Sequence, residues 1–180
     1  MANELPFFAP APGGVWRVQF AALPTGLEEL RALPMAASLT EPQYTAALTV
    51  AALCAYPFDK DAAIAMLNYL KGPQPLSTYE IQFLADRMRG KDYLPASFFE
   101  GATPENGYTP TLPYTVSVLE TPHSRAQLGE GYLQLYIRSG GADSLRPVKL
   151  RYKPSTGQWF LWEQMLLSDI RPPAAADLWQ

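Results

Sequence analysis

Basic and aromatic residues alternate over two neighbouring stretches near the end of the chain, in a pattern that suits anion binding. Lys149, Arg151 and Lys153 occupy every second position, and Phe160 and Trp162 repeat this spacing shortly afterwards. Every second side chain of a β-strand points to the same face of its sheet, so each set is expected on one face. Cations beside aromatic rings can hold an anionic group or accompany stacked nucleobases.

The turn between these stretches predicts how they pair. If residues 154–157 close a hairpin, cross-strand partners lie about 4.5–5.5 Å apart at Cβ, which places the cations next to the rings. Arg138 belongs to the preceding predicted strand and continues the same face with Tyr132 and Tyr136. The expected pairs are Lys153 with Gln158, Arg151 with Phe160, and Lys149 with Trp162. Lysine and arginine stems also cover rings on ordinary solvated faces, so a plain surface, a protein or peptide contact, and a nucleic acid or another anionic ligand all stay open.

A long loop rich in aromatic residues is the second candidate site. Residues 94–112 show no helix or strand period, and they include Phe98, Phe99, Tyr108 and an Asn-Gly turn signal at residues 106–107. Ordered loops of this length are uncommon and often functional. We therefore expect Phe98, Phe99 and Tyr108 to contribute to a contact surface.

Residues suited to catalysis or metal binding are scarce. The chain has one cysteine, Cys54, and one histidine, His123, whereas a zinc site uses several such ligands. Cys54 lies in an apolar run and is expected to be an inert thiol. His123 has no nucleophile-elbow pattern around it, and the acidic residues Glu100, Glu105 and Asp143 lack the spacing of a calcium loop. We therefore predict no catalytic residue, no metal and no cofactor.

Period-two alternation predicts an antiparallel sheet in the second half of the chain. Strands are expected over residues 113–120, 132–139, 147–153 and 158–164, with a short edge strand over 165–171; residues 15–20 alternate less cleanly and fit another short strand. The glycine-rich residues 140–144 join two strands, whereas a phosphate-binding loop leads into a helix. We expect a turn there, in which Asp143 bonds its own backbone or pairs with Arg146.

Helices are predicted in the first half. Residues 44–55 are apolar or small on nearly every side, so this helix should be buried against the inner face of the sheet. Thr40 is its expected N-cap, with Gln43 at capping-box distance. Two further helices are expected to begin after the caps Asp59 and Ser77, the second with Glu80 in a capping box, and a short helix is expected over residues 26–33.

Composition indicates an ordered, globular chain. The 180 residues are 48% hydrophobic and 17% charged, which suits one domain over residues 15–180 after a flexible segment over 1–14. Within it we expect a helical part over 26–90, the loop over 94–112 and the sheet over 113–171. The net charge of −3 argues against a dedicated nucleic-acid binder. Without a signal-peptide pattern or an apolar run of spanning length, we expect a cytoplasmic protein with no membrane contact.

Several motifs resemble an uncharacterised bacterial family defined only as a domain of unknown function. The clearest are residues 98–110 (FFEGATPENGYTP), 139–147 (SGGADSLRP) and 158–164 (QWFLWEQ), with shorter matches at 70–73, 113–114 and 170–173 and at Asp177 and Trp179. The resemblance extends from about residue 40 onward. It implies a single-domain bacterial cytoplasmic protein and brings no activity, cofactor or catalytic residue with it.

Together these features predict an α+β fold, with N-terminal helices packed on one face of a C-terminal antiparallel meander of four to five strands. The favoured function is a non-enzymatic binding or interaction domain for a protein or peptide. The alternative is a small-molecule-binding protein or enzyme with a pocket between the helices and a curved sheet. Such a pocket is known from the cone-shaped fold of the nuclear-transport-factor-2 superfamily, which shares this order of elements, although fold alone does not fix function. The pattern carries no information on oligomeric state.

Overall fold

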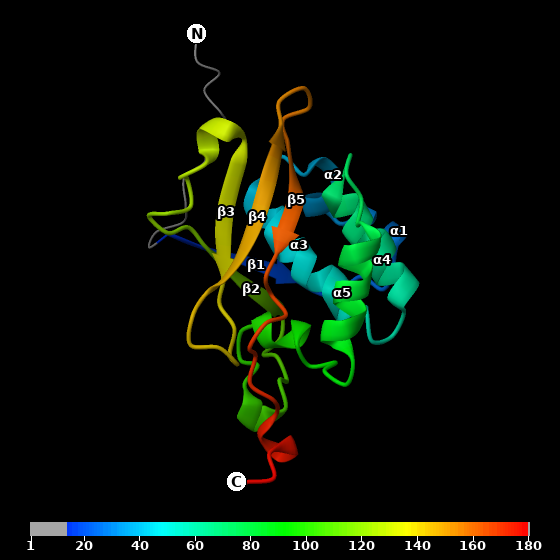
Figure 1. The fold of residues 1–180 in the computed structure, drawn as a ribbon, viewed down its shortest axis with the longest axis vertical. Helices are drawn as coiled ribbons and strands as arrows, with labels where there is room; N and C mark the ends of the chain where they lie inside the picture. The colour runs from blue at the N-terminus through cyan, green and yellow to red at the C-terminus, as the bar shows by residue number, and fades with distance from the viewer. Residues whose placement is uncertain (1–13, 180) are drawn as a thin grey trace.

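The computed structural model describes residues 14–179 as an α+β fold, with the helices on one face of a five-stranded antiparallel sheet (Figure 1). The predicted fold class is therefore confirmed. The strands lie side by side in chain order. They are β1 (Val15–Phe20), β2 (Tyr114–Leu119), β3 (Tyr132–Ile137), β4 (Arg146–Lys153) and β5 (Gln158–Gln164). All five helices lie in the connection between β1 and β2. The flexible segment expected over residues 1–14 falls almost wholly outside the described residues.

The expected edge strand over residues 165–171 is wrong. No residue of 165–171 belongs to a strand, and the adjacent side chains of Leu166 and Leu167 are both buried. The segment forms turns instead, and the Arg146 guanidinium donates hydrogen bonds to the carbonyls of Ser168 and Asp169 at 3.1 Å. The expected pairing of Asp143 with Arg146 is also wrong, because the Asp143 carboxylate accepts from Arg171 at 3.0 Å.

The helices begin and end largely where their caps predict. They are α1 (Leu27–Ala32), α2 (Pro34–Ser38), α3 (Pro42–Cys54), α4 (Lys60–Lys71) and α5 (Thr78–Met88). The Asp59 side chain caps α4, and Ser77 and Glu80 form the expected capping box of α5. The predicted Thr40 cap is wrong, because Glu41 is the N-cap residue of α3 and the Thr40 hydroxyl instead contacts Ser38.

Helix α3 forms the centre of the core. Apart from Tyr44 and Cys54, all of its residues are buried. It packs against α4 on one side and against β5, β2, β1 and β4 on the other. Its two buried threonines are satisfied: the Thr45 hydroxyl donates to the Trp159 carbonyl at 2.8 Å, and the Thr49 hydroxyl donates to the Thr45 carbonyl at 2.9 Å. The predicted burial of this helix against the sheet is therefore confirmed.

Truncation of the α3 leucines should be costly. Leu48 and Leu53 are fully buried, so Leu48→Ala or Leu53→Ala should lower the free energy of unfolding by about 2–5 kcal/mol, because each leaves a cavity. Chemical denaturation measures this. Leu178→Ala is the matched control, since that side chain is 92% exposed and should change stability by about 0.5 kcal/mol or less. A cost below about 1 kcal/mol for both core variants would contradict the central position of α3.

Candidate functional site

The sheet has one buried face and one open face, as the alternation predicts. On β3 and β4, Leu133, Leu135, Val148 and Leu150 face the helices and are fully buried. The other side chains form the outer face, where basic and aromatic residues predominate. They include Tyr132, Gln134 and Tyr136 of β3, Lys149, Arg151 and Lys153 of β4, and Phe160 and Trp162 of β5.

Four of these residues form a contact group that we call the outer-face cluster: Tyr132, Lys149, Arg151 and Trp162. Tyr132 lies opposite Arg151 across the β3–β4 pair. The Arg151 guanidinium carbon lies 5.3 Å from the Tyr132 ring centre and 4.8 Å from that of Trp162, and the Lys149 ammonium lies 5.0 Å from the Tyr132 ring centre. The two rings meet edge to face with centres 5.5 Å apart. The cations are therefore held by the rings, at about 0.5–1 kcal/mol for each exposed contact.

A β-bulge sets the position of Trp162. Arg151 lies opposite Phe160 and Lys153 opposite Gln158, as predicted. The predicted pair of Lys149 with Trp162 is wrong, because the register shifts and Lys149 lies opposite Glu163. Trp162 is thus the extra residue of β5, and a bulge re-aims the side chain at that point. Its ring contacts Arg151 instead, which strict alternation does not anticipate.

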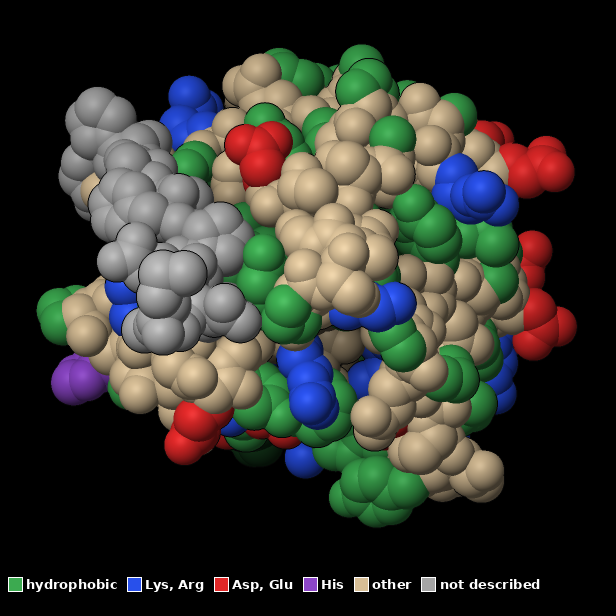
Figure 2. All heavy atoms as spheres, turned by 90° about the horizontal axis from the view of Figure 1, so that it is seen from above, with side chains coloured by type: hydrophobic (Ala, Val, Ile, Leu, Met, Phe, Trp, Pro, Cys, Tyr) green, Lys and Arg blue, Asp and Glu red, His purple; other side chains and the backbone are tan. Residues whose placement is uncertain are grey.

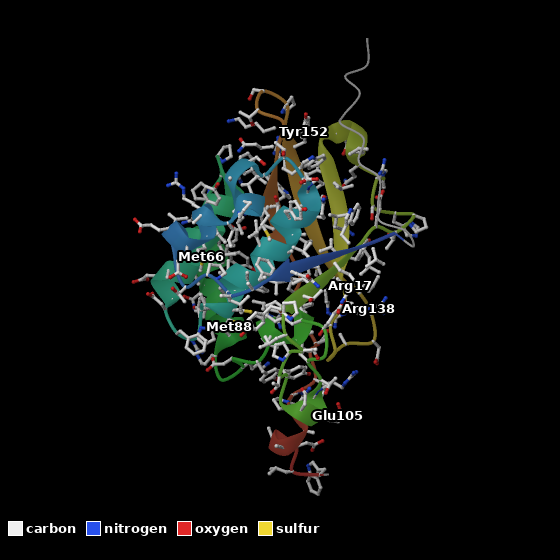
Figure 3. All side chains as sticks on the ribbon, turned by 180° about the vertical axis from the view of Figure 1, so that it is seen from behind. Arg17, Met66, Met88, Glu105, Arg138 and Tyr152 are labelled. Atoms are coloured by element: carbon white, nitrogen blue, oxygen red, sulfur yellow. The ribbon has the colours of Figure 1, made fainter. Side chains whose placement is uncertain are left out.

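Arg138 lies on the same face but outside the cluster. It follows β3, six positions from Tyr132, or roughly 20 Å along the strand. Its neighbour is Arg17 of β1 (Figure 3), since both flank Ser117 of β2. Arg17 is already engaged with the Glu100 carboxylate through two hydrogen bonds of 2.8 and 2.6 Å, which lower the pKa of Glu100.

The aromatic loop residues belong to the core and not to a contact surface. Phe98, Phe99 and Tyr108 are each at most 3% exposed. Phe99 packs on Tyr114 with ring centres 5.3 Å apart, and Tyr108 stacks on Tyr93 at 5.5 Å while its hydroxyl donates to the Arg171 carbonyl. The loop is ordered because its rings fill the space below the sheet, so the expectation that these three residues form an exposed site is corrected.

Two surface hollows flank the outer-face cluster. The first, of about 260 Å³, lies beside the β2–β3 connection and is lined by His123, Gln134, Tyr132 and Lys149 among others. The second, of about 390 Å³, lies beside the β4–β5 hairpin and is lined by Arg151, Lys153, Phe160, Trp162 and the Pro73–Gln74 segment that follows α4. Viewed from the hairpin end of the molecule, Lys and Arg side chains gather near the middle of the surface among hydrophobic ones (Figure 2).

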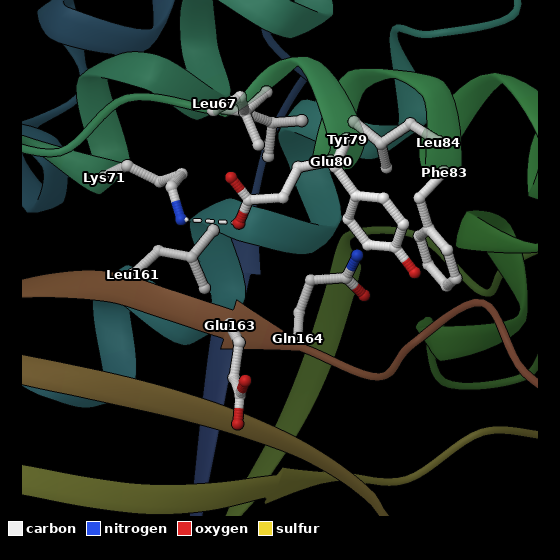
Figure 4. Close-up of a pocket in the computed structure, with 10 residues that line it drawn as sticks. Leu67, Lys71, Tyr79, Glu80, Phe83, Leu84, Leu161, Glu163 and Gln164 are labelled. Carbon is white, nitrogen blue, oxygen red and sulfur yellow. Dashed lines mark hydrogen bonds and ion pairs between the residues drawn. The ribbon is translucent and has the colours of Figure 1, made fainter.

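A further cleft of about 340 Å³ separates α4 and α5 from β5 (Figure 4). Leu67, Leu84 and Leu161 form its apolar part, and a charged pair lies at one end. The Lys71 ammonium, whose side chain is only 4% exposed, donates to the Glu80 carboxylate at 3.1 Å and to the Trp162 carbonyl at 2.9 Å. Sequence reasoning missed this pair because it depends on the angle between α4 and α5, which no local pattern reports.

The polar groups of this cleft serve the fold. Burial, the largest single influence, raises the pKa of Glu80, but hydrogen bonds from Ser77 and Lys71 outweigh it and leave the pKa below its ordinary value. The Gln164 side-chain oxygen accepts from the Leu166 backbone at 2.7 Å, and Glu163 points away from the pair (Figure 4). The space between helices and sheet is filled by α3, so the cleft is a groove at the sheet edge.

Metal-binding and nucleophilic groups are not assembled in the described part of the chain. Among residues 14–179, no three or more His, Cys, Asp or Glu side chains are grouped to hold a metal ion. Burial raises the pKa of the Cys54 thiol, which makes it a poor nucleophile. Within the same residues, no helix has the length and apolarity needed to cross a bilayer.

Comparison with known proteins gives one match. The model of a family described as Domain of unknown function (DUF6935) matches residues 22–174. No curated protein and no solved structure matches the chain. The family match agrees with the motif resemblance in the sequence and adds no activity to it.

The Lys71–Glu80 pair predicts a defined acid sensitivity. Because its pKa is lowered in the fold, the Glu80 carboxylate stabilises the protein above the ordinary carboxyl pKa of about 4.3, and this contribution is lost as pH falls through the folded-state pKa. Glu80→Gln should therefore lower the free energy of unfolding near pH 7, and its difference from wild type should shrink on acidification. Denaturant unfolding across pH measures both effects.

The control for this experiment is Glu163→Gln, which removes a carboxylate from the same cleft and leaves the Lys71 contact in place. This variant should retain the acid sensitivity that depends on the pair. A Glu80→Gln penalty of the same size at neutral and acidic pH would contradict the proposed role of the ionised carboxylate.

Proposed function

The chain belongs to the DUF6935 family of unknown function, and we propose that it is a non-enzymatic, cytoplasmic interaction domain whose outer sheet face binds an acidic segment of a partner protein. The observation that carries this proposal is the outer-face cluster. In it, Lys149 and Arg151 are held over the rings of Tyr132 and Trp162, on the sheet face opposite the five described α-helices (Figure 1).

The charge on this face supports an anionic ligand. The chain as a whole carries a net charge of −3, yet Lys149, Arg151 and Lys153 stand together on one strand. Among the described residues, the ion pairs involve other cations and none of these three. Their charges are thus available to a partner, and complementary charge provides specificity and faster association.

The geometry of the rings favours a protein ligand over nucleic acid. Proteins that bind single strands without sequence preference present open aromatic faces on which bases stack. Here Tyr132 and Trp162 are half-buried, and their faces are already in contact with Lys149 and Arg151. The negative net charge of the chain also repels a polyanion at longer range. A short acidic peptide segment matches a small basic patch better.

The alternative function, a small-molecule site between helices and sheet, has less support. Helix α3 fills that space, and the charged groups of the edge cleft bond one another. The first hollow is lined by His123 and Ser124, but Ser124 is buried, its hydroxyl oxygen accepts from the Thr121 amide at 2.8 Å, and among the described residues no hydrogen bond joins it to the imidazole that would have to activate it. An interaction surface is therefore the function that the geometry supports best.

The charge contribution can be tested with a neutralised face. The triple variant Lys149→Gln, Arg151→Gln and Lys153→Gln should stay folded, because exposed substitutions usually change stability by about 0.5 kcal/mol or less and each lost ring contact costs about 0.5–1 kcal/mol. Fluorescence anisotropy with acidic, neutral and basic peptides of equal length should show selective binding of the acidic peptide by wild type. This binding should weaken with salt, because exposed charges are screened beyond about 10 Å at 0.1 M, and the triple variant should lose it.

The matched control removes three cations from elsewhere. Lys60, Arg87 and Lys91 are exposed, and Arg87 lies over the Phe83 ring at 5.1 Å, so it mimics the ring contact of Arg151. The Lys60→Gln, Arg87→Gln and Lys91→Gln protein has the same net charge as the first variant and should bind like wild type. Salt-insensitive binding that survives neutralisation of the outer face would place the interface on another surface.

A further inference from the structure

We infer that the acidic segment crosses the outer face from the first hollow to the second, and that it carries two acidic groups about three residues apart. This inference rests on the proposed function and specifies its ligand. The basis for it is that the outer-face cluster separates two hollows on the outer face of the sheet, each lined by basic side chains.

The cluster forms a ridge between the two hollows. Tyr132 lines the first hollow, whereas Arg151 and Trp162 line the second. Contact between the two rings, with centres 5.5 Å apart, makes the ridge continuous. A ligand that uses both hollows must therefore pass over the rings.

Each hollow has its own cation. The Lys149 side chain lines the first hollow, and Arg151 and Lys153 line the second. Lys71 also borders the second hollow, but its ammonium is occupied by Glu80 and the Trp162 carbonyl. One carboxylate in each hollow would meet at least one cation that has no ion-pair partner among the described residues, whereas a single carboxylate would reach the cations of one hollow only.

The spacing of the cations along β4 sets the separation of the acidic groups. Lys149 lies two positions before Arg151 and four before Lys153, which corresponds to about 7 and 13 Å along the strand. An extended chain advances about 3.3–3.6 Å per residue. A segment that runs from the first hollow to the second thus covers a separation of this size in about three residues. The residues between the acidic groups lie against the exposed part of the half-buried Tyr132 and Trp162 rings, a contact that needs no open ring face, so apolar spacer residues fit best.

The walls of the second hollow are fixed, which favours a defined spacing. Phe160 packs so closely on the chain after α4 that a Cβ added at Gly72 would lie 2.4 Å from the Phe160 ring. Gly72 also has φ +63°, which disfavours any side chain there. The hairpin and the Pro73–Gln74 segment are thereby held together, and the position of the second anionic group is set by rigid elements.

The test compares labelled peptides of identical composition that differ only in the arrangement of two glutamates. In one peptide the glutamates are adjacent, in the second they stand three positions apart with apolar residues between, and in the third they stand eight positions apart. Fluorescence anisotropy at low salt should show that the second peptide binds roughly tenfold tighter than the others, because only it places a carboxylate in both hollows at once. Lys149→Gln should remove most of this advantage, Lys153→Gln should reduce it because Arg151 remains in the second hollow, and Lys91→Gln should leave it unchanged.

Each outcome has a distinct meaning. Equal affinity for the three arrangements, with loss of binding in the neutralised triple variant, would overturn the two-hollow inference and leave the proposed function standing. Acidic peptides that bind neither selectively nor with salt dependence would overturn the proposed function itself. Tighter binding of a single-stranded oligonucleotide than of the spaced peptide would overturn the assignment of a protein partner. Circular dichroism of every variant should match wild type, and a variant that unfolds is replaced by the corresponding Lys→Met change.

Discussion

A helix that is apolar on every side must be covered on every side, and α3 imposes this constraint on the fold. The sheet covers one side and α4 covers the other, while the loop after α5 closes its C-terminal end through η1 (Pro95–Phe98). Phe98, Phe99 and Tyr108, which the sequence suggests as a contact surface, are buried in this part of the core. Helix α3 occupies the central space, and the clefts described above lie at the sheet edge and on the outer face.

The helical layer also closes the β5 edge of the sheet. An exposed edge strand presents unpaired backbone groups that can pair with another chain. Here the Trp159 amide donates to the Leu39 carbonyl at 2.7 Å, the Thr45 hydroxyl bonds the Trp159 carbonyl, and Lys71 bonds the Trp162 carbonyl. A buried ammonium is costly unless it is paired, and Glu80 supplies the pair. These contacts cover the β5 edge against strand addition and leave the outer face for the interaction that we propose.

Local patterns in the sequence predicted the elements, and features that depend on tertiary structure escaped them. Alternation over β3 to β5 reports burial on one face directly, and the caps at Asp59 and Ser77 are satisfied within one turn of helix. The β-bulge at Trp162 has no signal in the residue types of β5. The register that pairs Lys149 with Glu163 could therefore not be predicted from the sequence. The alternation correctly placed Lys149, Arg151 and Lys153 on the outer face of the sheet. It could not place Phe98, Phe99 and Tyr108, because aromatic residues of a core and of a contact surface cannot be told apart by residue type.

The same contacts that stabilise the outer-face cluster would prepare it for the binding that we propose. A free arginine side chain loses up to about 2 kcal/mol of conformational freedom when it is fixed by a ligand. Arg151 is already held against both the Tyr132 and Trp162 rings, so part of that cost is met during folding. Lys71 contributes from the helical side, because its bond to the Trp162 carbonyl fixes the bulge that presents the ring. The buried Lys71–Glu80 pair and the outer-face cluster are thus linked through Trp162. The arrangement of the cluster therefore depends on the packing of α4 against β5.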